Sequence, residues 1–447
     1  PTLGWGSDFR IQVLTMEKTK IAIVGLGTVG TGVARLLLEQ AERTARHAGQ
    51  TIWLEKVVVR NRNKARDIEL PEGVLTDRLE EVTENPDIRC VAQLIGGLEP
   101  ARSIMIRLLE SGKDIVTANK ALLAEHGAEL FDRARELGRS IAFDAAVAGG
   151  IPIVTNIGQC LAANRIESIH GILNGTCNFI ISQMEEHGVS YAEAVEEAQQ
   201  RGYAEADPTT DVDGSDAAQK LALLAHLAFG ARVHWKEIPR QGIESLSRID
   251  LRYARELGYR LKLLAVARLE EEELELHVGA QLVRCDSPMA DVGGAYNAIR
   301  LVGDAVGRVW FHGMGAGRMP TASAVAADLI DTVVGRTAIT FRTLQLWSEK
   351  PARVVPRPSF TTSTRYYLRF TVKDHPGVLA DITGALSREG ISIASFIQHE
   401  RHEVEDDRVP LIIMTHQTTV GAADRAMEKI NQLEMVHEPA VRLRILD

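Results

Sequence analysis

A glycine-rich turn near the start of the chain constrains the fold more than any other feature. The segment from Ile21 to Gly30 has the pattern of a short apolar strand that runs into a G-x-G-x-x-G turn, and a helix is predicted over Thr31–Gln40. In this pattern Gly25 permits the tight turn, Gly27 lets the backbone approach a pyrophosphate, and Gly30 lets the helix pack closely on the strand. The first N–H groups of such a helix attract phosphate. We therefore predict a dinucleotide-binding turn, and a purely structural turn is the alternative.

Strands and helices alternate from this turn to about residue 145. Further strands are predicted at Leu54–Val59, Cys90–Ile95, Asp114–Val116 and Ser140–Asp144. Helices are predicted between them at Pro100–Ser111 and Gly127–Leu137. This order predicts an α/β domain of the Rossmann type, with a parallel sheet, over residues 16–150. Met16 has the surroundings of a natural start, so residues 1–15 are expected to be an upstream extension.

The second predicted strand ends in a basic segment, from Arg60 to Lys64. A site specific for NAD usually has Asp or Glu here to bind the ribose 2′-hydroxyl, whereas Arg suits a 2′-phosphate. We therefore predict NADPH as the preferred cofactor, with NADH as the alternative. A solvated basic loop without a ligand is the other interpretation of this segment.

The pattern changes after about residue 150. The clearest elements that follow are helices at Tyr191–Arg201 and Ser215–Phe229 and strands at Lys262–Leu269 and Leu274–Val283. They predict an α+β domain for substrate binding and dimerisation over residues 151–308. A glycine-rich stretch that includes Gly317 precedes a helix at Ala322–Val334. We expect residues 309–340 to return and pack on the nucleotide domain.

The end of the chain forms a separate unit. Pro351, Pro356 and Pro358 favour a linker over residues 341–363. The elements predicted after it are strands at Tyr366–Val372, Ile391–Gln398, Val409–His416 and Val441–Leu446, a helix that ends at Arg388 and a helix at Ala422–Leu433. Their order predicts a C-terminal βαββαβ domain over residues 364–447.

Composition excludes several classes of partner. The formal net charge of the 447 residues is −9, which argues against a nucleic-acid partner. No apolar run approaches the length needed to span a bilayer, so no membrane association is expected. The four cysteines lie far apart without a C-x-x-C pair, which favours reduced thiols in a cytoplasmic protein and neither disulfides nor a zinc site.

An acidic loop before the second long helix is the strongest candidate for chemistry. Its carboxylates lie within a short reach of Lys220 and belong to Glu205, Asp207, Asp211, Asp213 and Asp216. Asp216 and Lys220 are four residues apart and share one helix face. A lysine with a tuned pKa can protonate the alkoxide that forms when hydride reduces a carbonyl, and nearby acids can bind an α-amino group. A surface salt bridge in a solvated loop is the plain alternative.

A second lysine lies where open α/β sheets bind ligands. Lys120 closes the segment Val116-Thr-Ala-Asn-Lys, directly after the fourth strand, at the carboxyl edge of the predicted sheet. It can touch cofactor or substrate there, or it can be a surface lysine at a helix start. Gly96 follows the third strand, beside the expected cofactor.

Five segments in order resemble homoserine dehydrogenase. They are G-L-G-T-V-G, T-A-N-K, F-D-A-A-V-A-G-G-I-P, the G-I-L-N-G-T of Gly171–Thr176 and G-Y-A-E-A-D-P. The match as a whole covers about Lys18 to Val334. The resemblance implies reversible reduction of L-aspartate 4-semialdehyde to L-homoserine with NAD(P)H, on the route to threonine, isoleucine and methionine.

The resemblance also implies roles for individual residues. Lys220 would handle the proton, and Lys120 would lie between cofactor and substrate. The substrate-binding residues would be Glu205, Asp211, Asp216 and Thr176. The residues that line the cofactor would be Gly25, Gly27, Thr28, Val29, Gly30, Arg60, Gly96, Lys120 and Gly317.

Members of the family that this chain resembles hold a sodium ion near the junction of the two domains. The matching positions, an acidic side chain and backbone carbonyls, are Asp144, Val147, Gly149 and Ile151. Asp144 departs from the pattern, because many relatives have the longer Glu there. Cys177 stands where Thr is frequent, and we interpret it as a packing substitution.

The last domain resembles an ACT domain, a small module that senses amino acids, through D-H-P-G-V-L-A and the helix that follows. The candidate effector residues are Asp374, Gly377, Val378, Leu379 and Gln398. Threonine is the expected effector, and an assembly module that binds nothing is the alternative. We expect a homodimer or homotetramer.

Two rival functions remain open at this point. Another Rossmann reductase, such as aspartate-semialdehyde dehydrogenase, would need a nucleophilic cysteine, and Cys177 is the only plausible one. A non-catalytic regulator built from the same nucleotide and amino-acid modules is the other.

Overall fold

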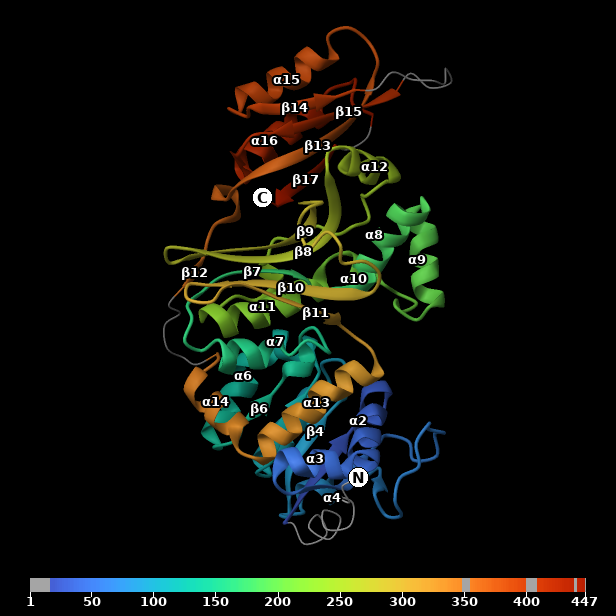
Figure 1. Ribbon diagram of the computed structural model, residues 1–447, viewed down its shortest axis with the longest axis vertical. Coiled ribbons are helices and arrows are strands. Elements are labelled where there is room, and N and C mark those ends of the chain that lie inside the picture. The colour runs from blue at the N-terminus through green and yellow to red at the C-terminus, as the bar shows by residue number, and fades with distance from the viewer. Residues whose placement is uncertain (1–16, 348–353, 399–407, 438–439, 447) are drawn as a thin grey trace, which may run out of the picture.

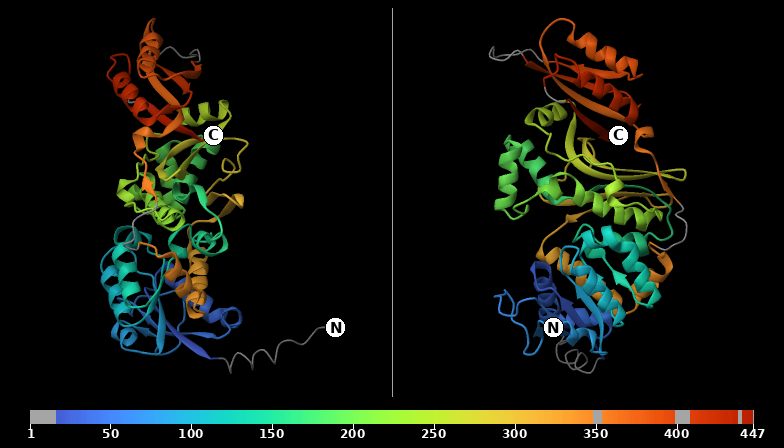
Figure 2. Two further views of the ribbon diagram at one scale, coloured as in Figure 1. Left: turned by 90° about the vertical axis from the view of Figure 1, so that its left-hand side faces the viewer. Right: turned by 180° about the vertical axis from the view of Figure 1, so that it is seen from behind.

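The computed structural model describes residues 17–347, 354–398, 408–437 and 440–446. They stack in three tiers along the longest axis: the nucleotide domain at the bottom of Figure 1, a mixed sheet in the middle and the C-terminal domain at the top. Figure 2 shows the same order from two other sides. The predicted start at Met16 and the extension over residues 1–15 lie outside the described residues.

The first tier is a six-stranded parallel sheet in the order β3-β2-β1-β4-β5-β6. Its strands are β1 (Lys18–Val24), β2 (Thr51–Val58), β3 (Leu75–Thr76), β4 (Ile88–Gln93), β5 (Asp114–Thr117) and β6 (Ile141–Ala142). The helices are α2 (Thr28–Glu39), α3 (Ala41–Ala48), α4 (Glu80–Thr83), α5 (Ala101–Glu110) and α6 (Lys120–Glu136). The prediction of a Rossmann-type parallel sheet is confirmed.

Both faces of this sheet are covered. Ile21 and Ile23 of β1 pack in one apolar cluster with α2, whereas Ala22 and Val24 pack in another with α5 and α6. A parallel sheet buried on both faces needs nearly continuous apolar strands, which explains the pattern of β1.

The helix α13 (Arg318–Val333) returns to this domain and packs beside α2, as predicted. A Cβ atom added at Gly32 of α2 would lie 2.8 Å from the Cβ of Ala322, so the two helices meet closely. Two expectations for this region were wrong. Residues 309–314 belong to the strand β11 (Gly307–Met314) of the second sheet, and the helix α14 (Arg336–Leu344) occupies the start of the predicted linker.

The second sheet has eleven strands: nine follow the order β11-β10-β7-β8-β9-β17-β13-β15-β14, and the short strands β12 and β16 pair with β9 and β13. Those of the middle tier are β7 (Ile166–Ile172), β8 (Tyr259–Glu270), β9 (Glu273–Arg284), β10 (Tyr296–Gly303) and β11. The helical segments around them are η1 (Asp144–Ala146), α7 (Ile153–Thr155), η2 (Asn156–Cys160), α8 (Gly175–His187), α9 (Tyr191–Gln200), α10 (Thr209–Val212), α11 (Ser215–Phe229), η3 (Trp235–Glu237) and α12 (Arg248–Glu256).

The C-terminal domain has its own apolar core and the predicted βαββαβ order. Its elements are β12 (Val355–Pro356), η4 (Ser359–Thr361), β13 (Ser363–Lys373), α15 (Val378–Arg388), β14 (Ile393–Ile397), β15 (Arg408–Thr415), β16 (Thr418–Thr419), α16 (Val420–Asn431) and β17 (Val441–Leu446). The strand β17 pairs in parallel with β9, so this domain extends the sheet of the middle tier.

Among the residues that the structure describes, no helix combines the length and apolar character needed to cross a membrane.

Candidate active site

The glycine turn has the geometry that its spacing predicts. Gly25 has a φ of +105°, in the region that favours glycine. A Cβ atom at Gly30 would lie 2.1 Å from the carbonyl oxygen of Gly25, so only glycine lets α2 start this close to the strand. A Cβ atom at Gly27 would meet nothing within 4 Å, which leaves open space beside the backbone. The backbone can therefore approach a phosphate at this point.

A cleft of about 850 Å³ opens beside this turn. Gly25, Gly27 and Arg60 line it together, and Lys64 and Arg66 add two more cationic side chains. The cleft lies between β1 and β4, where the strand order of the sheet reverses. Its size and its basic rim suit a dinucleotide.

The other predicted cofactor residues lie around this turn or at the junction with the second tier. Thr28 and Val29 begin α2, and Gly30 is buried beneath them. Gly96 is exposed in the loop after β4. Gly317 has a φ of +123° and directly precedes α13, the helix that packs on α2.

Asn119 is a residue that the sequence analysis missed. Its side-chain Nδ2 donates to the carbonyl oxygens of Ile95 (2.9 Å) and Gly97 (2.7 Å), and its Oδ1 accepts from the backbone N of Leu122. Asn119 thus ties the loop after β4 to the start of α6. This contact fixes the position of Lys120, the first residue of that helix.

Lys220, Asp216 and Lys120 form one charge cluster, in which Lys220 and Asp216 are buried and the side chain of Lys120 is 37% exposed. The Nζ of Lys220 lies 2.7 Å from Asp216 Oδ2 and donates to the carbonyl oxygen of Leu173 at 2.7 Å. The Nζ of Lys120 lies 3.1 Å from Asp216 Oδ1. The side chains of Lys220 and Asp216 are only 11% and 8% exposed, so the interpretation as a surface salt bridge was wrong. Lys120 joins the nucleotide domain to this cluster, so it is no isolated surface lysine either.

The charges of the cluster stabilise one another. Burial alone would raise the pKa of Asp216, but the ammonium groups of Lys220 and Lys120 outweigh it and hold that pKa well below its usual range. The carboxylate of Asp216 in turn raises the pKa of Lys120, against the effect of burial. The cluster therefore holds an ionised carboxylate next to the charged Lys120 at neutral pH.

Asn174 connects the acids and was also missed. Its Nδ2 donates to Asp211 Oδ1 at 2.7 Å and to Asp216 Oδ2 at 2.9 Å, while its Oδ1 caps α8 at Cys177. Burial, followed by the charge of Asp216, raises the pKa of Asp211. Asn174 lies inside the G-I-L-N-G-T segment, so the motif itself was the signal that could have found it.

The remaining acids of the loop separate into two groups. Glu205 is exposed, and its charge helps to raise the pKa of Lys120, so it belongs to the electrostatic environment of the cluster. Asp207 and Asp213 instead bond to Thr209 and Ser215. Thr176 Oγ1 donates to the carbonyl oxygen of Tyr203 at 2.7 Å, which fastens the loop near the start of α8.

Cys177 does not have the environment of a nucleophile. It is fully buried, burial raises the pKa of its thiol, and its Sγ donates to the carbonyl oxygen of Asp211. A thiol kept neutral is a poor nucleophile. The structure therefore favours the packing interpretation of this cysteine.

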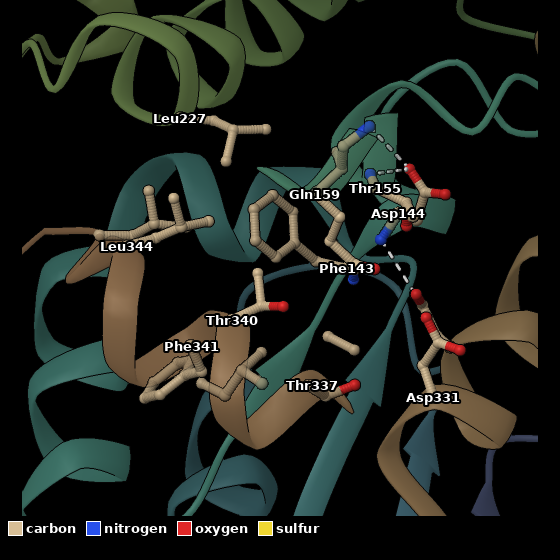
Figure 3. Close-up of a pocket in the computed structure, with 15 residues that line it drawn as sticks. Phe143, Asp144, Thr155, Gln159, Leu227, Asp331, Thr337, Thr340, Phe341 and Leu344 are labelled. Atoms are coloured by element: carbon tan, nitrogen blue, oxygen red, sulfur yellow. Dashed lines mark hydrogen bonds between the residues drawn. The ribbon is translucent and has the colours of Figure 1, made fainter. Parts of the chain in front are cut away.

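Asp144 lies in η1, at the junction of the first two tiers. Its Oδ1 accepts from the backbone N of Val154 at 2.8 Å, and its own backbone N donates to Asp328 Oδ2 at 2.9 Å (Figure 3). Val147, Gly149 and Ile151 follow in the same turn. Within the described residues, no group of three or more His, Cys, Asp or Glu side chains is suited to a metal ion.

The structure brings the candidate effector residues together at the start of α15. Gly377 has a φ of +103° and precedes that helix, whose first residues are Val378 and Leu379. Gln398 Nε2 donates to Asp374 Oδ1 at 3.4 Å, which joins the end of β14 to the same turn. Val378 is buried, and Leu379 is 39% exposed.

Comparisons with known proteins agree with this arrangement. The family model described as homoserine dehydrogenase matches residues 152–330, the model of its NAD-binding domain matches residues 25–144, and the ACT domain model matches residues 366–434. A homoserine dehydrogenase of Pseudomonas aeruginosa is 43% identical over 433 residues, which cover 96% of this chain and 99% of that protein.

Two solved structures extend the likeness. The crystal structure of a homoserine dehydrogenase from Thiobacillus denitrificans has a TM-score of 0.88 at 41% identity and covers 97% of this chain and 99% of that one. A hyperthermophilic archaeal homoserine dehydrogenase in complex with NADPH has a TM-score of 0.58 at 26% identity, over 70% of this chain and 97% of that one. The chain therefore belongs to the homoserine dehydrogenase family, with a nicotinamide-binding domain and a C-terminal ACT domain.

Proposed function

We propose that Lys220, held by Asp216, supplies the proton when L-aspartate 4-semialdehyde is reduced to L-homoserine. The observation that carries this proposal is the position of Asp216 between two ammonium groups, Lys220 from the second tier and Lys120 from the nucleotide domain. Both lysines are thereby gathered on one carboxylate at the junction of the two domains.

The chemistry of each side chain follows from its contacts. A bound dihydronicotinamide supplies the hydride that the carbonyl carbon accepts. Lys220 Nζ then donates a proton to the carbonyl oxygen, while Asp216 and the carbonyl of Leu173 keep the ammonium oriented. Lys120 places a second positive charge near the developing alkoxide.

The acids around the cluster are suited to hold the substrate. Asp211 and Glu205 offer negative charge to the α-ammonium group of an amino acid, and Asn174 keeps Asp211 in line with Asp216. We assign Thr176 to the support of the loop that carries Glu205, since its hydroxyl bonds to Tyr203 in that loop.

We infer that NADPH is the preferred cofactor. Arg60, Lys64 and Arg66 line the rim of the cleft next to the end of β2, where the ribose 2′-substituent is bound in sites of this type. The similar archaeal enzyme was solved in complex with NADPH.

We infer a sodium ion at the turn after Asp144. Val147 and Gly149 are buried residues, and within the described residues no backbone N–H donates to either carbonyl oxygen. Buried carbonyls without a partner are rare, and a hard cation would satisfy both. We expect a higher Tm in sodium chloride than in choline chloride of equal concentration, and the replacement Asp144→Ala should abolish the difference. Equal Tm values of the wild-type protein in both salts would rule out this ion.

We infer that the ACT domain binds threonine and that the chain forms a homodimer or homotetramer. The turn at Gly377 presents backbone N–H groups at the start of α15, and Asp374 and Gln398 place polar groups beside it. A free amino acid needs such a combination of backbone and side-chain donors and acceptors.

A spectrophotometric assay tests the proposal as a whole. Purified protein is given homoserine with NADP or with NAD, each with and without threonine. We expect reduction of NADP with a higher kcat/KM than that of NAD, and inhibition by threonine. A protein that reduces neither cofactor would contradict the enzymatic assignment and favour a non-catalytic sensor.

A further inference from the structure

The second sheet carries a polar cavity of about 310 Å³ that the proposed function does not use. His170 of β7 and His277 of β9 line it, whereas their neighbours Ile169, Leu276 and Val278 point to the opposite face and pack in the core that contains α11. The cavity therefore lies on the other side of the sheet from the cluster of Lys220, which is part of α11.

Cross-strand pairing brings the arginine and histidine side chains of this cavity together. Arg300 of β10 pairs with His170, and both continue through Val266 of β8 to His277 in one row. The next row along the sheet contains Arg268. Side chains opposite one another in adjacent strands share a face and lie close together.

One carboxylate in this cavity is already fully engaged. Glu275 Oε1 lies 3.0 Å from Arg444 Nη1 and 3.1 Å from His277 Nδ1. These contacts hold the pKa of Glu275 at about 2, although burial alone would raise it. Of the four arginines that line the cavity, Glu275 thus neutralises Arg444, and Glu270 pairs with Arg268.

Two of those cations have no carboxylate partner among the described residues, Arg300 and Arg308. Arg300 lies over the ring of Trp310, with 6.0 Å between its Cζ atom and the ring centroid, and its Nε is buried without a hydrogen bond. The Nδ1 of His170 is likewise buried without a partner, and that residue is 5% exposed. Buried polar atoms of this kind are unfavourable unless something bonds to them.

We propose that this cavity binds a compact anion with two or more negative charges, of the phosphate or dicarboxylate class, between Arg300, Arg308 and His170. A guanidinium group matches the oxygens of either class in a forked geometry. Ser168 lines the same cavity and adds a hydroxyl group that can donate to the anion. A volume near 300 Å³ suits a small metabolite and excludes a dinucleotide.

The cavity lies between two domains, which gives binding a further consequence. Thr364, Gln417 and Arg444 reach it from the C-terminal domain, while Arg300 and His170 belong to the middle tier. An anion held by both sides stabilises their contact. We therefore expect the Tm of the full chain to rise with the concentration of the anion.

Calorimetric titration of the full chain tests the proposal, first with inorganic phosphate and then with succinate. The protein is saturated with NADP throughout, so that the cofactor cleft cannot take up the titrant. We expect at least one of the two anions to bind, and Arg300→Gln and Arg308→Gln each to weaken binding about tenfold or more, the loss of one charge-assisted hydrogen bond. Arg89→Gln, which changes an exposed arginine of β4, is the matched control and should leave the affinity unchanged.

Several outcomes would overturn the proposal. The first is that neither phosphate nor succinate binds. The second is that Arg300→Gln and Arg308→Gln both bind the anion as well as the wild-type protein and the Arg89→Gln control do, which would identify an adventitious ion only, bound elsewhere. Variants that alter the sedimentation coefficient but not the anion affinity would identify this face as an interface between copies of the chain. Arg308 is exposed, so Arg308→Gln keeps the test valid even if Arg300→Gln fails to fold.

Discussion

Asp216 carries the negative charge that two ammonium groups share. One carboxylate oxygen contacts Lys220 and the other contacts Lys120, and Asn174 completes the hydrogen bonds. Removal of one partner from a buried ion pair is strongly destabilising, because it leaves an uncompensated charge. The same carboxylate thus serves the stability of the domain junction and the orientation of the proposed proton donor.

The sequence predicted this cluster only in part. The spacing of Asp216 and Lys220 placed both on one face of a helix, because neighbours on a helix follow a local rule. The contact of Lys120 with Asp216 joins segments about a hundred residues apart, and a periodic pattern in the sequence cannot predict such a long-range contact. Asn174 and Asn119 were not predicted for a related reason. An amide carries no charge, and the role of each of these two side chains depends on which segments it connects in the folded protein.

The basic segment that follows β2 predicts a preference for NADPH that depends on Arg60. Replacing Arg60 by Ala should lower kcat/KM for NADPH by roughly 10- to 100-fold, because one charge-assisted hydrogen bond to a phosphate is lost. The kcat/KM for NADH should change little. Steady-state kinetics with both cofactors measure the ratio. Arg62→Ala is the matched control, because Arg62 is exposed in the same loop but does not line the cleft. An unchanged ratio in Arg60→Ala would refute the assignment of the 2′-phosphate.

At the scale of elements, the helix α12 and the strand β13 join the middle tier to the ACT domain. Asp250 of α12 is fully buried and accepts from Arg369 Nε at 2.7 Å and from Tyr367 Oη at 3.1 Å, both on β13. It also completes a capping box with Ser247 at the start of its helix. One carboxylate therefore caps the start of a helix and binds the neighbouring domain.

This joint predicts a large effect on stability. Asp250→Ala should lower the free energy of unfolding by about 3–5 kcal/mol, because the guanidinium of Arg369 is left buried without a counter-charge. Chemical denaturation measures the change. The exposed pair of Glu110 and Arg133 is the control, and Glu110→Ala should cost less than about 1 kcal/mol. A double variant, Asp250→Leu with Arg369→Met, should recover much of the lost stability. Similar losses of stability in Asp250→Ala and Glu110→Ala would contradict the role of the buried pair.

Secondary structure was predictable where the apolar pattern is strong. The buried strands of the first sheet and the amphipathic helices of the ACT domain have such a pattern, and their positions agree with the prediction. β11 was misjudged because it pairs on one side only, with β10, and none of its residues is fully buried. The helix α14 was missed because it lies directly before the proline-rich stretch, and only Gly335, at a φ of +86°, marks its start.

At the scale of the whole molecule, the ACT domain continues the sheet of the middle tier (Figure 1). β17 pairs with β9, and Arg369 neutralises Asp250. Deleting the domain would therefore leave β9 without its neighbour β17 and leave Asp250 without its counter-charge. Loss of activity after such a truncation would therefore say little about regulation. Point changes in the effector turn are the better probe.

The effector turn predicts a separable change in regulation. Gln398→Ala should raise the threonine concentration for half-inhibition by about tenfold or more, the loss of one hydrogen bond to a charged ligand, and leave kcat without threonine unchanged. Inhibition curves of the full chain provide the measurement. Ser387→Ala, an exposed position near the other end of α15, is the control. An inhibition curve of Gln398→Ala that overlies the wild-type curve would rule out this turn as the threonine site.

The central claim is that Lys220 provides the proton for reduction of the semialdehyde, and one measurement tests it most directly. Turnover of Lys220→Ala is compared with that of the wild-type protein and of Lys236→Ala, an exposed lysine, while fluorescence titration follows NADPH binding. We expect kcat of Lys220→Ala to fall by roughly 10²- to 10⁴-fold with NADPH affinity retained, as for the loss of a general acid. A kcat that stays near the wild-type value in a variant that still binds NADPH would contradict the claim.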